Sequence, residues 1–342
     1  CIDHLAQLRS ASFSPPDTLE AEVGAEQLDY RDVVGQQFAV RALTIAAAGG
    51  HGALLIGPPG AGKSMLAKRL PSILPPLDEE ERIETALIHS VAGLNLHAIT
   101  SGVRPFRAPH HSATVASLVG GGSGNVRPGE VSLAHNGVLF LDEFAEFSNS
   151  ALQALRQPIE DGRVVVSRVG SRAVFPARFQ LIAASNPCPC GFLGDAAHAC
   201  RCSENQISHY QAKLGGPLKD RIDLICEVTR VDPTRVLESG RGTCSARIAD
   251  EVRAARERAS WRGERMESLG NVTPHEVIES CGLSTAGHKL IEDMAHKHFL
   301  SGRGIVRILR VARTIADLDE SESVREEHLL ESCMYRVDNN LE

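Results

Sequence analysis

The sequence lacks the long apolar runs and the leader segment that mark membrane-spanning and secreted proteins. No apolar run approaches the roughly 18 to 20 residues that a bilayer-spanning helix needs. The N-terminus also lacks a basic start followed by an apolar stretch. Apolar residues make up 42% and charged residues 23% of the 342 residues, which is typical of globular chains with about two domains. We therefore expect a soluble, cytoplasmic protein without a membrane partner.

The sequence also lacks a net positive charge and a cysteine pattern typical of disulfides. The formal net charge of -7 argues against a surface that is basic all over, as in a protein that passively coats DNA, but leaves room for a local basic stripe. Nine cysteines are an odd number, which favours free thiols or a metal site over disulfides in a chain without a leader.

Strands that alternate with helices predict an α/β fold. Buried strands are expected at 53–56, 138–141 and 180–184, with a hairpin at 163–175. Helices are expected at 38–48, 63–70 and 150–160. This order predicts a parallel sheet with helices on both faces. Beyond Asp232-Pro233, Arg/Glu-rich helices at 246–262, 284–299 and 303–318 predict a smaller, all-α lid domain.

The predicted domains are a core at 29–231 and a helical lid at 232–342. The chain begins at Cys1 rather than Met, and residues 1–28 show little periodicity. We interpret this first segment as a linker or as the remnant of a preceding domain.

A phosphate-binding motif follows the first predicted strand. The sequence matches G-x-x-x-x-G-K-[ST] between a buried strand and a helix, where backbone N–H groups and the helix N-terminus can face an anion. In this motif Lys63 is expected to reach the β- and γ-phosphates and Ser64 to bind Mg²⁺. The predicted nucleotide-contacting residues here are Gly57, Pro58, Pro59, Gly60, Ala61, Gly62, Lys63, Ser64 and Met65.

Polar residues at the ends of the next two predicted strands complete a hydrolytic site. Asp142 directly follows one strand and can hold Mg²⁺, while Glu143 can polarise the attacking water. Asn186 follows the other strand, where it can orient that water. A metal ligand beside a general base predicts hydrolysis of a nucleoside triphosphate rather than binding alone.

With these motifs in place, the chain resembles the AAA+ ATPases. Residues 32–36 resemble the segment that packs near the adenine in those proteins, which would assign Val34 and Gly35 to the nucleotide site. Residues 216–223 resemble the arginine-finger segment, and residues 301–303 resemble the second sensor. The resemblance implies that Arg221 reaches a neighbouring subunit's ATP, that Arg303 acts in cis, and that the subunits form a ring, usually a hexamer.

Other roles remain open for these arginines. Arg221 can form a salt bridge with Asp220 or Asp223 instead. Arg307 and Arg310 lie on adjacent turns of the same predicted helix and can share or take the role of Arg303.

Two insertions indicate a branch of the AAA+ proteins. Residues 118–136 resemble a loop inserted in the second helix, and residues 159–179 resemble a hairpin before the first sensor. Within that branch, residues 104–112, 129–143 and 186–191 closely resemble the magnesium chelatase-like ComM/YifB family. The resemblance implies ATP-driven DNA branch migration that supports natural transformation. That family typically carries an N-terminal Lon-protease-like domain, so we expect either a piece of a longer protein or a relative without it.

Two other functions fit the same motor. One is a magnesium chelatase motor that drives metal insertion into a porphyrin, and the other is a protein-remodelling motor. A basic hairpin favours DNA, because residues 151–180 carry five arginines against Glu160 and Asp161, a local excess of +3. Few aromatics lie nearby, so contacts to the DNA backbone are expected rather than base stacking. The candidate DNA contacts are Arg163, Arg168 and Arg172, and ordinary surface arginines remain the alternative.

Four cysteines form a candidate metal site. Cys188, Cys190, Cys200 and Cys202 make two C-x-C pairs on a short loop and could bind one structural Zn²⁺. Free thiols or paired disulfides are the alternatives, and His198 could replace one ligand. For the neighbouring histidines His110 and His111, a structural or pore-facing role is favoured over catalysis.

Overall fold

The structure is a computed structural model of the chain. It describes residues 28–121, 126–168, 171–195, 197–214, 218, 221–231, 242–263 and 273–336. The expected linker, apart from Leu28, lies outside these residues, as do 122–125 of the glycine-rich loop and the hairpin turn at 169–170.

Five parallel strands form the central sheet. The three predicted strands lie side by side at its centre, which confirms them, and two short strands that the pattern did not predict lie at its edges. One edge strand has only two residues and the other ends in Cys226-Glu227, so neither produces a continuous apolar run. The spatial order is β2 (Phe106–Arg107), β5 (Val138–Leu141), β8 (Gln180–Ser185), β1 (Ala53–Ile56) and β9 (Leu224–Glu227).

Helices cover both faces of this sheet, as predicted. Because successive side chains of a strand point to opposite faces, Leu54 and Leu55 enter two different cores. The core around Leu55 includes α2 (Gln37–Gly49) and α3 (Lys63–Arg69). The core around Leu54 includes α8 (Asn149–Ala154), α10 (Glu204–Leu214) and the β6–β7 hairpin (Arg163–Arg168 and Ser171–Pro176).

The helix expected at 150–160 is two helices, α8 and α9 (Arg156–Asp161), separated at Leu155. Pro158 explains the break, since it has no N–H to donate to the carbonyl of Ala154. The remaining elements of this part are η1 (Tyr30–Asp32), η2 (Leu70–Ile73), α4 (Glu79–Ala92), α5 (His97–Thr100), α6 (Val115–Val119), β3 (Gly120–Gly121), β4 (Arg127–Pro128), α7 (Glu130–Leu133) and η3 (Phe144–Glu146).

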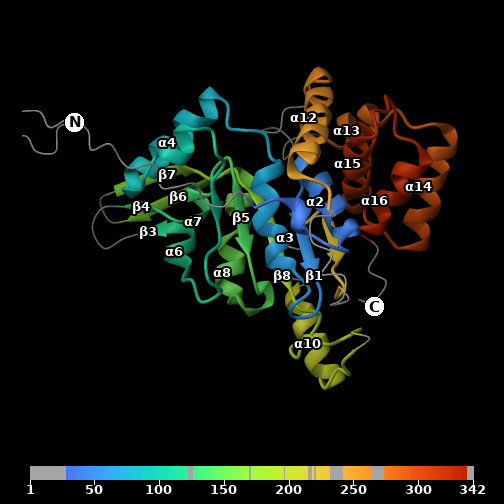
Figure 1. Ribbon diagram of the computed structural model, residues 1–342, viewed down its shortest axis with the longest axis horizontal. Helices are drawn as coiled ribbons and strands as arrows, with labels where there is room; N and C mark the ends of the chain where they lie inside the picture. The colour runs from blue at the N-terminus through green and yellow to red at the C-terminus, as the bar shows by residue number, and fades with distance from the viewer. Residues whose placement is uncertain are drawn as a thin grey trace, which may run out of the picture.

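The C-terminal residues form the smaller helical group. Its central helix, α15, is buried along most of its length and packs against α2 of the first part. Figure 1 shows this group, coloured orange to red, at the opposite end of the molecule from the β3–β4 and β6–β7 hairpins. Its helices are α12 (Ser245–Trp261), α13 (Pro274–Cys281), α14 (Thr285–Lys297), α15 (Gly302–Leu318) and α16 (Glu326–Met334).

Among the described residues, no helix is both long enough and apolar enough to cross a membrane.

Candidate nucleotide-binding site

The predicted phosphate loop connects the carboxyl end of β1 to α3. Gly62 caps α3 in the left-handed conformation at φ 90°, which side chains disfavour. A Cβ atom on Gly57 would lie 2.1 Å from the carbonyl oxygen of Val228, so the loop packs directly against the chain that leaves β9. These glycines allow the loop to curl so that the N-terminus of α3 faces an anion.

Lys63 is bound into this loop. Its ammonium donates hydrogen bonds to the carbonyl oxygens of Gly57 at 2.6 Å and Pro58 at 3.0 Å. It also donates to Oδ1 of Asn186 at 3.1 Å, which brings together two of the predicted site residues. Burial lowers the pKa of Lys63, and the nearby charge of Asp142 opposes this shift.

Ser64 and Asp142 form the predicted metal pair. The Ser64 hydroxyl donates a hydrogen bond to Oδ2 of Asp142 at 2.6 Å, so oxygens from α3 and from the end of β5 lie side by side. Mg²⁺ prefers a few such oxygen ligands together with phosphate oxygens, and this donor set fits it. When bound, Mg²⁺ supplies positive charge that neutralises the charge developing on the phosphates.

Glu143 is next to this pair and is held by a histidine. Its backbone has φ 51°, a left-handed value that is uncommon outside glycine, and its side chain is 57% exposed. Its Oε2 lies 2.7 Å from Nδ1 of His111, whose ring packs on that of His110 with centroids 4.0 Å apart. Sequence reasoning missed this contact, because the strand that leads to His111, β2, is too short to show a pattern.

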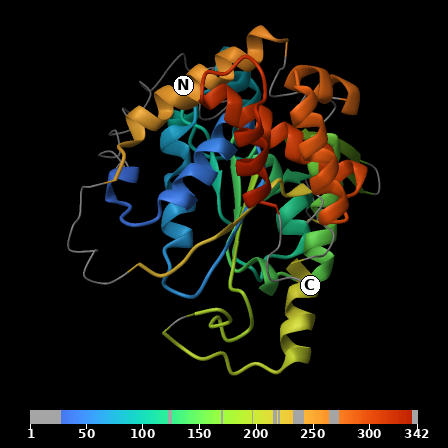
Figure 2. The ribbon, with the colours of Figure 1, turned by 90° about the vertical axis from the view of Figure 1, so that its right-hand side faces the viewer.

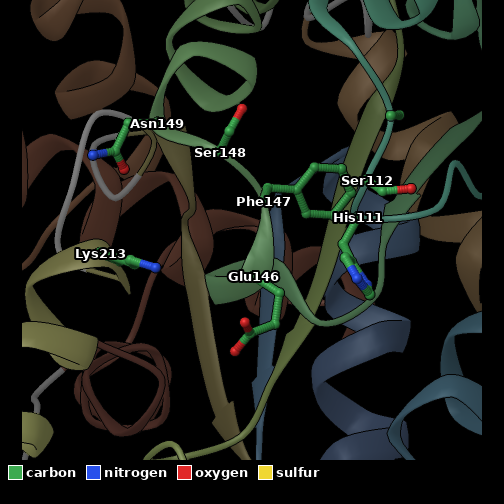
Figure 3. Close-up of a pocket in the computed structure, with 8 residues that line it drawn as sticks. His111, Ser112, Glu146, Phe147, Ser148, Asn149 and Lys213 are labelled. Carbon is green, nitrogen blue, oxygen red and sulfur yellow. The ribbon is translucent and has the colours of Figure 1, made fainter.

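A cavity of about 410 Å³ lies beside His111, the residue that contacts Glu143. Figure 3 shows His111 and Ser112 on one side of it and Lys213 of α10 on the other. Lys213 donates a hydrogen bond to the carbonyl of Ala145 at 3.2 Å, which ties α10 to the segment after Glu143. Glu146 also lines this space, so a second carboxylate lies three residues from the first.

The segment predicted to pack near the adenine contacts the phosphate loop through Gln36. The Gln36 side chain donates hydrogen bonds to the carbonyls of Ala61 at 3.1 Å and Thr229 at 2.6 Å. Gly35 has φ 72°, and a Cβ there would lie 3.1 Å from Val231. Val34 is half-buried beside them. Gln36 was not among the predicted binding residues, although its buried amide makes the connection.

Arg221 and Arg303, the two arginines predicted to act on ATP, do not line the phosphate loop but a separate cavity. Arg221 forms an ion pair with Glu160 of α9 rather than with Asp223, which contacts His51; Asp220 lies outside the described residues. Arg221 and Arg303 line one cavity of about 1170 Å³, together with Arg307 and Arg310.

This cavity lies at the amino ends of the strands, since Gly52 and Gly137 also line it and precede β1 and β5. The phosphate loop follows the carboxyl end of β1, a strand of four residues or about 13 Å. Arg303, near the start of α15, lines this cavity. Its expected role in cis stays a prediction.

The β6–β7 hairpin presents two of the three candidate DNA contacts. Val164 and Val166 point into the core, so the alternate positions of the hairpin face outward, and Arg163 and Arg172 are both exposed there. The side chain of Arg168 lies outside the described residues. Arg178, which contributed to the local charge excess, is paired with Glu84 and therefore belongs to the framework.

The sheet order and the cluster of Lys63, Ser64, Asp142 and Asn186 at its carboxyl edge define a P-loop protein of the AAA+ class. The family model described as magnesium chelatase, subunit ChlI, matches residues 29–236. The model of the C-terminal part of the same subunit matches residues 242–336. The chain therefore belongs to the magnesium chelatase-like AAA+ family, in which use of ATP and Mg²⁺ is implied.

Several relatives belong to its ComM/YifB group. The chain is 45% identical to competence protein ComM of Haemophilus influenzae over 92% of this chain and 61% of that protein. It is 42% identical to YifB of Escherichia coli over 95% of this chain and 64% of that protein. A magnesium-chelatase 67 kDa subunit of Chlorobaculum parvum is 29% identical over 46% of this chain and 23% of that protein. The chain thus spans about three-fifths of the length of the first two relatives.

Proposed function

We propose that this chain is the ATP-hydrolysing motor of a ring-forming protein that moves DNA branches, in the manner implied by its resemblance to ComM. The observation that carries the hydrolytic part is the 2.6 Å contact between Ser64 and Asp142, with Glu143 beside it and Lys63 bound to Asn186. These groups are the ones that position a metal-bound triphosphate and a water molecule.

The separation between the phosphate loop and the predicted arginines supports assembly into a ring. Arg221 and Arg303 line a cavity at the amino ends of the strands, whereas Lys63 lies past the carboxyl end of β1, a strand about 13 Å long. We infer that neither arginine reaches a phosphate bound by its own subunit. Both can serve the site of a neighbour, because a guanidinium pairs well with phosphate oxygens and cannot lose its charge. The proposed assembly is a homo-oligomer, a hexamer by resemblance to the class.

The β6–β7 hairpin is the proposed DNA contact. Arg163 and Arg172 are exposed on its outward face, and a ring would repeat them once per subunit. Contacts of this kind neutralise phosphates without reading sequence and weaken as salt rises. The resemblance of most of the chain to a competence protein supports DNA as the substrate.

DNA-stimulated ATP hydrolysis tests this proposal. We expect forked or single-stranded DNA to raise the ATPase rate at low salt, and an Arg163→Ala/Arg172→Ala variant to lose the stimulation while keeping its basal rate. Arg247→Ala/Arg253→Ala is the matched control, because these two exposed arginines of α12 lie far from the hairpin. A rate that DNA leaves unchanged, with no shift in a binding assay, would contradict a DNA motor.

The same assay separates the alternatives. The similarity to a magnesium-chelatase subunit favours a chelatase motor as the second candidate, although it covers only 46% of this chain. Stimulation by a chelatase partner with porphyrin, and none by DNA, would favour that function. Stimulation by unfolded protein alone would favour a remodelling motor.

A further inference from the structure

Four thiols converge on the loop that joins β8 to α10. The sulfur of Cys188 lies 3.4 Å from that of Cys190 and 3.7 Å from that of Cys200, and Cys190 and Cys200 are 3.6 Å apart. With Cys202 included, all four sulfurs lie within 4.8 Å of one another. They come from two C-x-C pairs separated by a turn-rich loop, so the folded chain has gathered them from both ends of that loop.

These separations distinguish between the possible thiol chemistries. A disulfide requires sulfurs about 2.05 Å apart, and the three measured separations are far longer. Four sulfurs at about 2.3 Å from a common tetrahedral ion are about 3.8 Å from one another. The three separations are close to that value, and the sulfur of Cys202 lies within 4.8 Å of the other three. The cluster therefore has nearly the size of a four-sulfur site for one ion.

The surroundings of the cluster fit a metal better than free thiols. The backbone N–H of Leu193 donates a hydrogen bond to the sulfur of Cys188 at 3.3 Å, as outer groups do to the ligands of a metal site. Phe192 stacks on His198, with ring centroids 5.0 Å apart, on a loop that otherwise has few large apolar side chains. Such a loop has little core of its own, and a metal would supply the missing cross-link.

We propose that Cys188, Cys190, Cys200 and Cys202 bind one structural Zn²⁺ through four thiolates. A closed, all-sulfur tetrahedral set selects Zn²⁺ or an iron–sulfur centre over the hard cations. Four ligands for one ion, with none left to an exchangeable water, indicate a structural rather than a catalytic site. His198 is not a ligand, since its Nδ1 lies 3.6 Å from Asp195 and it is not one of the converging groups.

The location of the cluster gives the metal a second consequence, which rests on the proposed function. Asn186, the residue bonded to Lys63, lies two positions before Cys188. A Cβ on Gly191, inside the loop, would lie 2.7 Å from Pro59 of the phosphate loop, so the two loops pack closely. Asp195 in turn pairs with Arg230, beyond β9, at 3.0 Å.

The metal-bound loop would therefore pack against the phosphate loop and hold it in place. Figures 1 and 2 agree that the chain between β8 and α10 lies beyond the carboxyl ends of the strands. We expect zinc to hold this loop in place and thereby fix the position of Asn186 and Pro59.

Metal analysis of the full chain tests the site directly. Protein purified without added metal should contain about one Zn²⁺ per chain, and a Cys200→Ser/Cys202→Ser variant should lose it. Cys244→Ser is the matched control, since this thiol lies outside the cluster and should leave the zinc content unchanged. A second variant separates loss of a ligand from loss of the fold. Cys202→His, which supplies a nitrogen ligand in place of the thiolate, should retain the metal with weaker affinity.

Cobalt substitution gives a readout that does not depend on activity. Protein exchanged into Co²⁺ should show the intense thiolate charge-transfer absorption of a tetrahedral all-sulfur site, absent from the double variant and present in Cys244→Ser. Absence of both zinc and the cobalt spectrum would overturn the site, as would iron in place of zinc or thiol titration that finds the four cysteines as disulfides.

Nucleotide affinity tests the second consequence separately. Removal of zinc should weaken binding of a fluorescent ATP analogue by about tenfold, which corresponds to about 1.4 kcal/mol. Stoichiometric zinc with unchanged nucleotide affinity after its removal would keep the metal site and overturn its support of the phosphate loop. Zinc-loaded protein that does not bind ATP at all would instead contradict the proposed function and leave the metal site intact.

Discussion

The two ends of the parallel strands carry different parts of the proposed chemistry; we call the side where the strands end the carboxyl edge and the side where they begin the amino edge. At the carboxyl edge, Lys63, Ser64 and Asp142 make direct hydrogen bonds within one small site. At the amino edge, Arg221 and Arg303 line an arginine-rich cavity formed by segments far apart in the sequence. The first half is built by a local motif and can be complete within one chain. The second half depends on how α15 packs against α2, and its arginines are proposed to contact a phosphate bound by a neighbouring subunit.

The largest expected effect separates binding from hydrolysis at the carboxyl edge. Glu143→Gln should lower the ATPase rate by about 10²–10⁴-fold while ATP still binds, because an amide keeps the shape of the carboxylate but cannot accept a proton. Steady-state hydrolysis and nucleotide binding measure the two parts. Glu146→Gln is the control, a nearby carboxylate that lines the adjoining cavity. Normal turnover in Glu143→Gln would show that Glu143 is not the general base.

A smaller effect is expected from the histidine that holds this carboxylate. His111→Ala should lower the hydrolysis rate by about tenfold, because Glu143 loses the contact that fixes its side chain. His111→Asn, which can still donate a hydrogen bond, should recover part of that loss. ATP affinity should change little in either variant, and an equal loss of affinity and rate would indicate a damaged site instead of a displaced base.

The smallest effect on the ATPase rate is expected from Asp223 at the amino edge, where a substitution should instead lower the free energy of unfolding. Buried His51 lies 3.0 Å from Asp223 and 2.8 Å from Thr314 of α15, so it connects the residues just before β9 to the helical group. Burial raises the pKa of Asp223, but the hydrogen bond from His51 and the charges of Arg310 and Arg307 outweigh it and lower the pKa below its usual value.

Because folding lowers the pKa of this carboxyl group, the free energy of unfolding depends on pH. The contribution of Asp223 is fully present above the unfolded pKa of about 4 and is lost as the pH falls through its lower folded value. Asp223→Asn should reduce the free energy of unfolding near neutral pH by about 1.5–3 kcal/mol, because the hydrogen bond to His51 loses its charged partner, and should flatten its decline in acid. Urea unfolding at several pH values measures both, with exposed Asp250→Asn as the control. An unchanged acid profile would remove Asp223 from this account.

Sequence patterns predicted what is local and missed what is tertiary. The phosphate motif and Asp142 follow continuous apolar strands, so their neighbourhood could be predicted from the position of each strand end. His111 follows a strand of two residues, and its contact with Glu143 depends on that strand pairing with β5. The role of Arg303 in cis stays a prediction, because a helix sequence does not reveal which end of the strands the helix lies against.

Mixed rings test the central claim, that each ATP site takes its arginines from the next subunit. Lys63→Ala subunits lack a working phosphate loop but keep their arginines, whereas Arg221→Ala or Arg303→Ala subunits keep the loop. The account predicts that each variant alone is nearly inactive and that mixing Lys63→Ala with either arginine variant restores ATP hydrolysis. Mixtures no more active than the sum of their parts would contradict it, and rescue of Arg221→Ala but not of Arg303→Ala would return Arg303 to a role in cis.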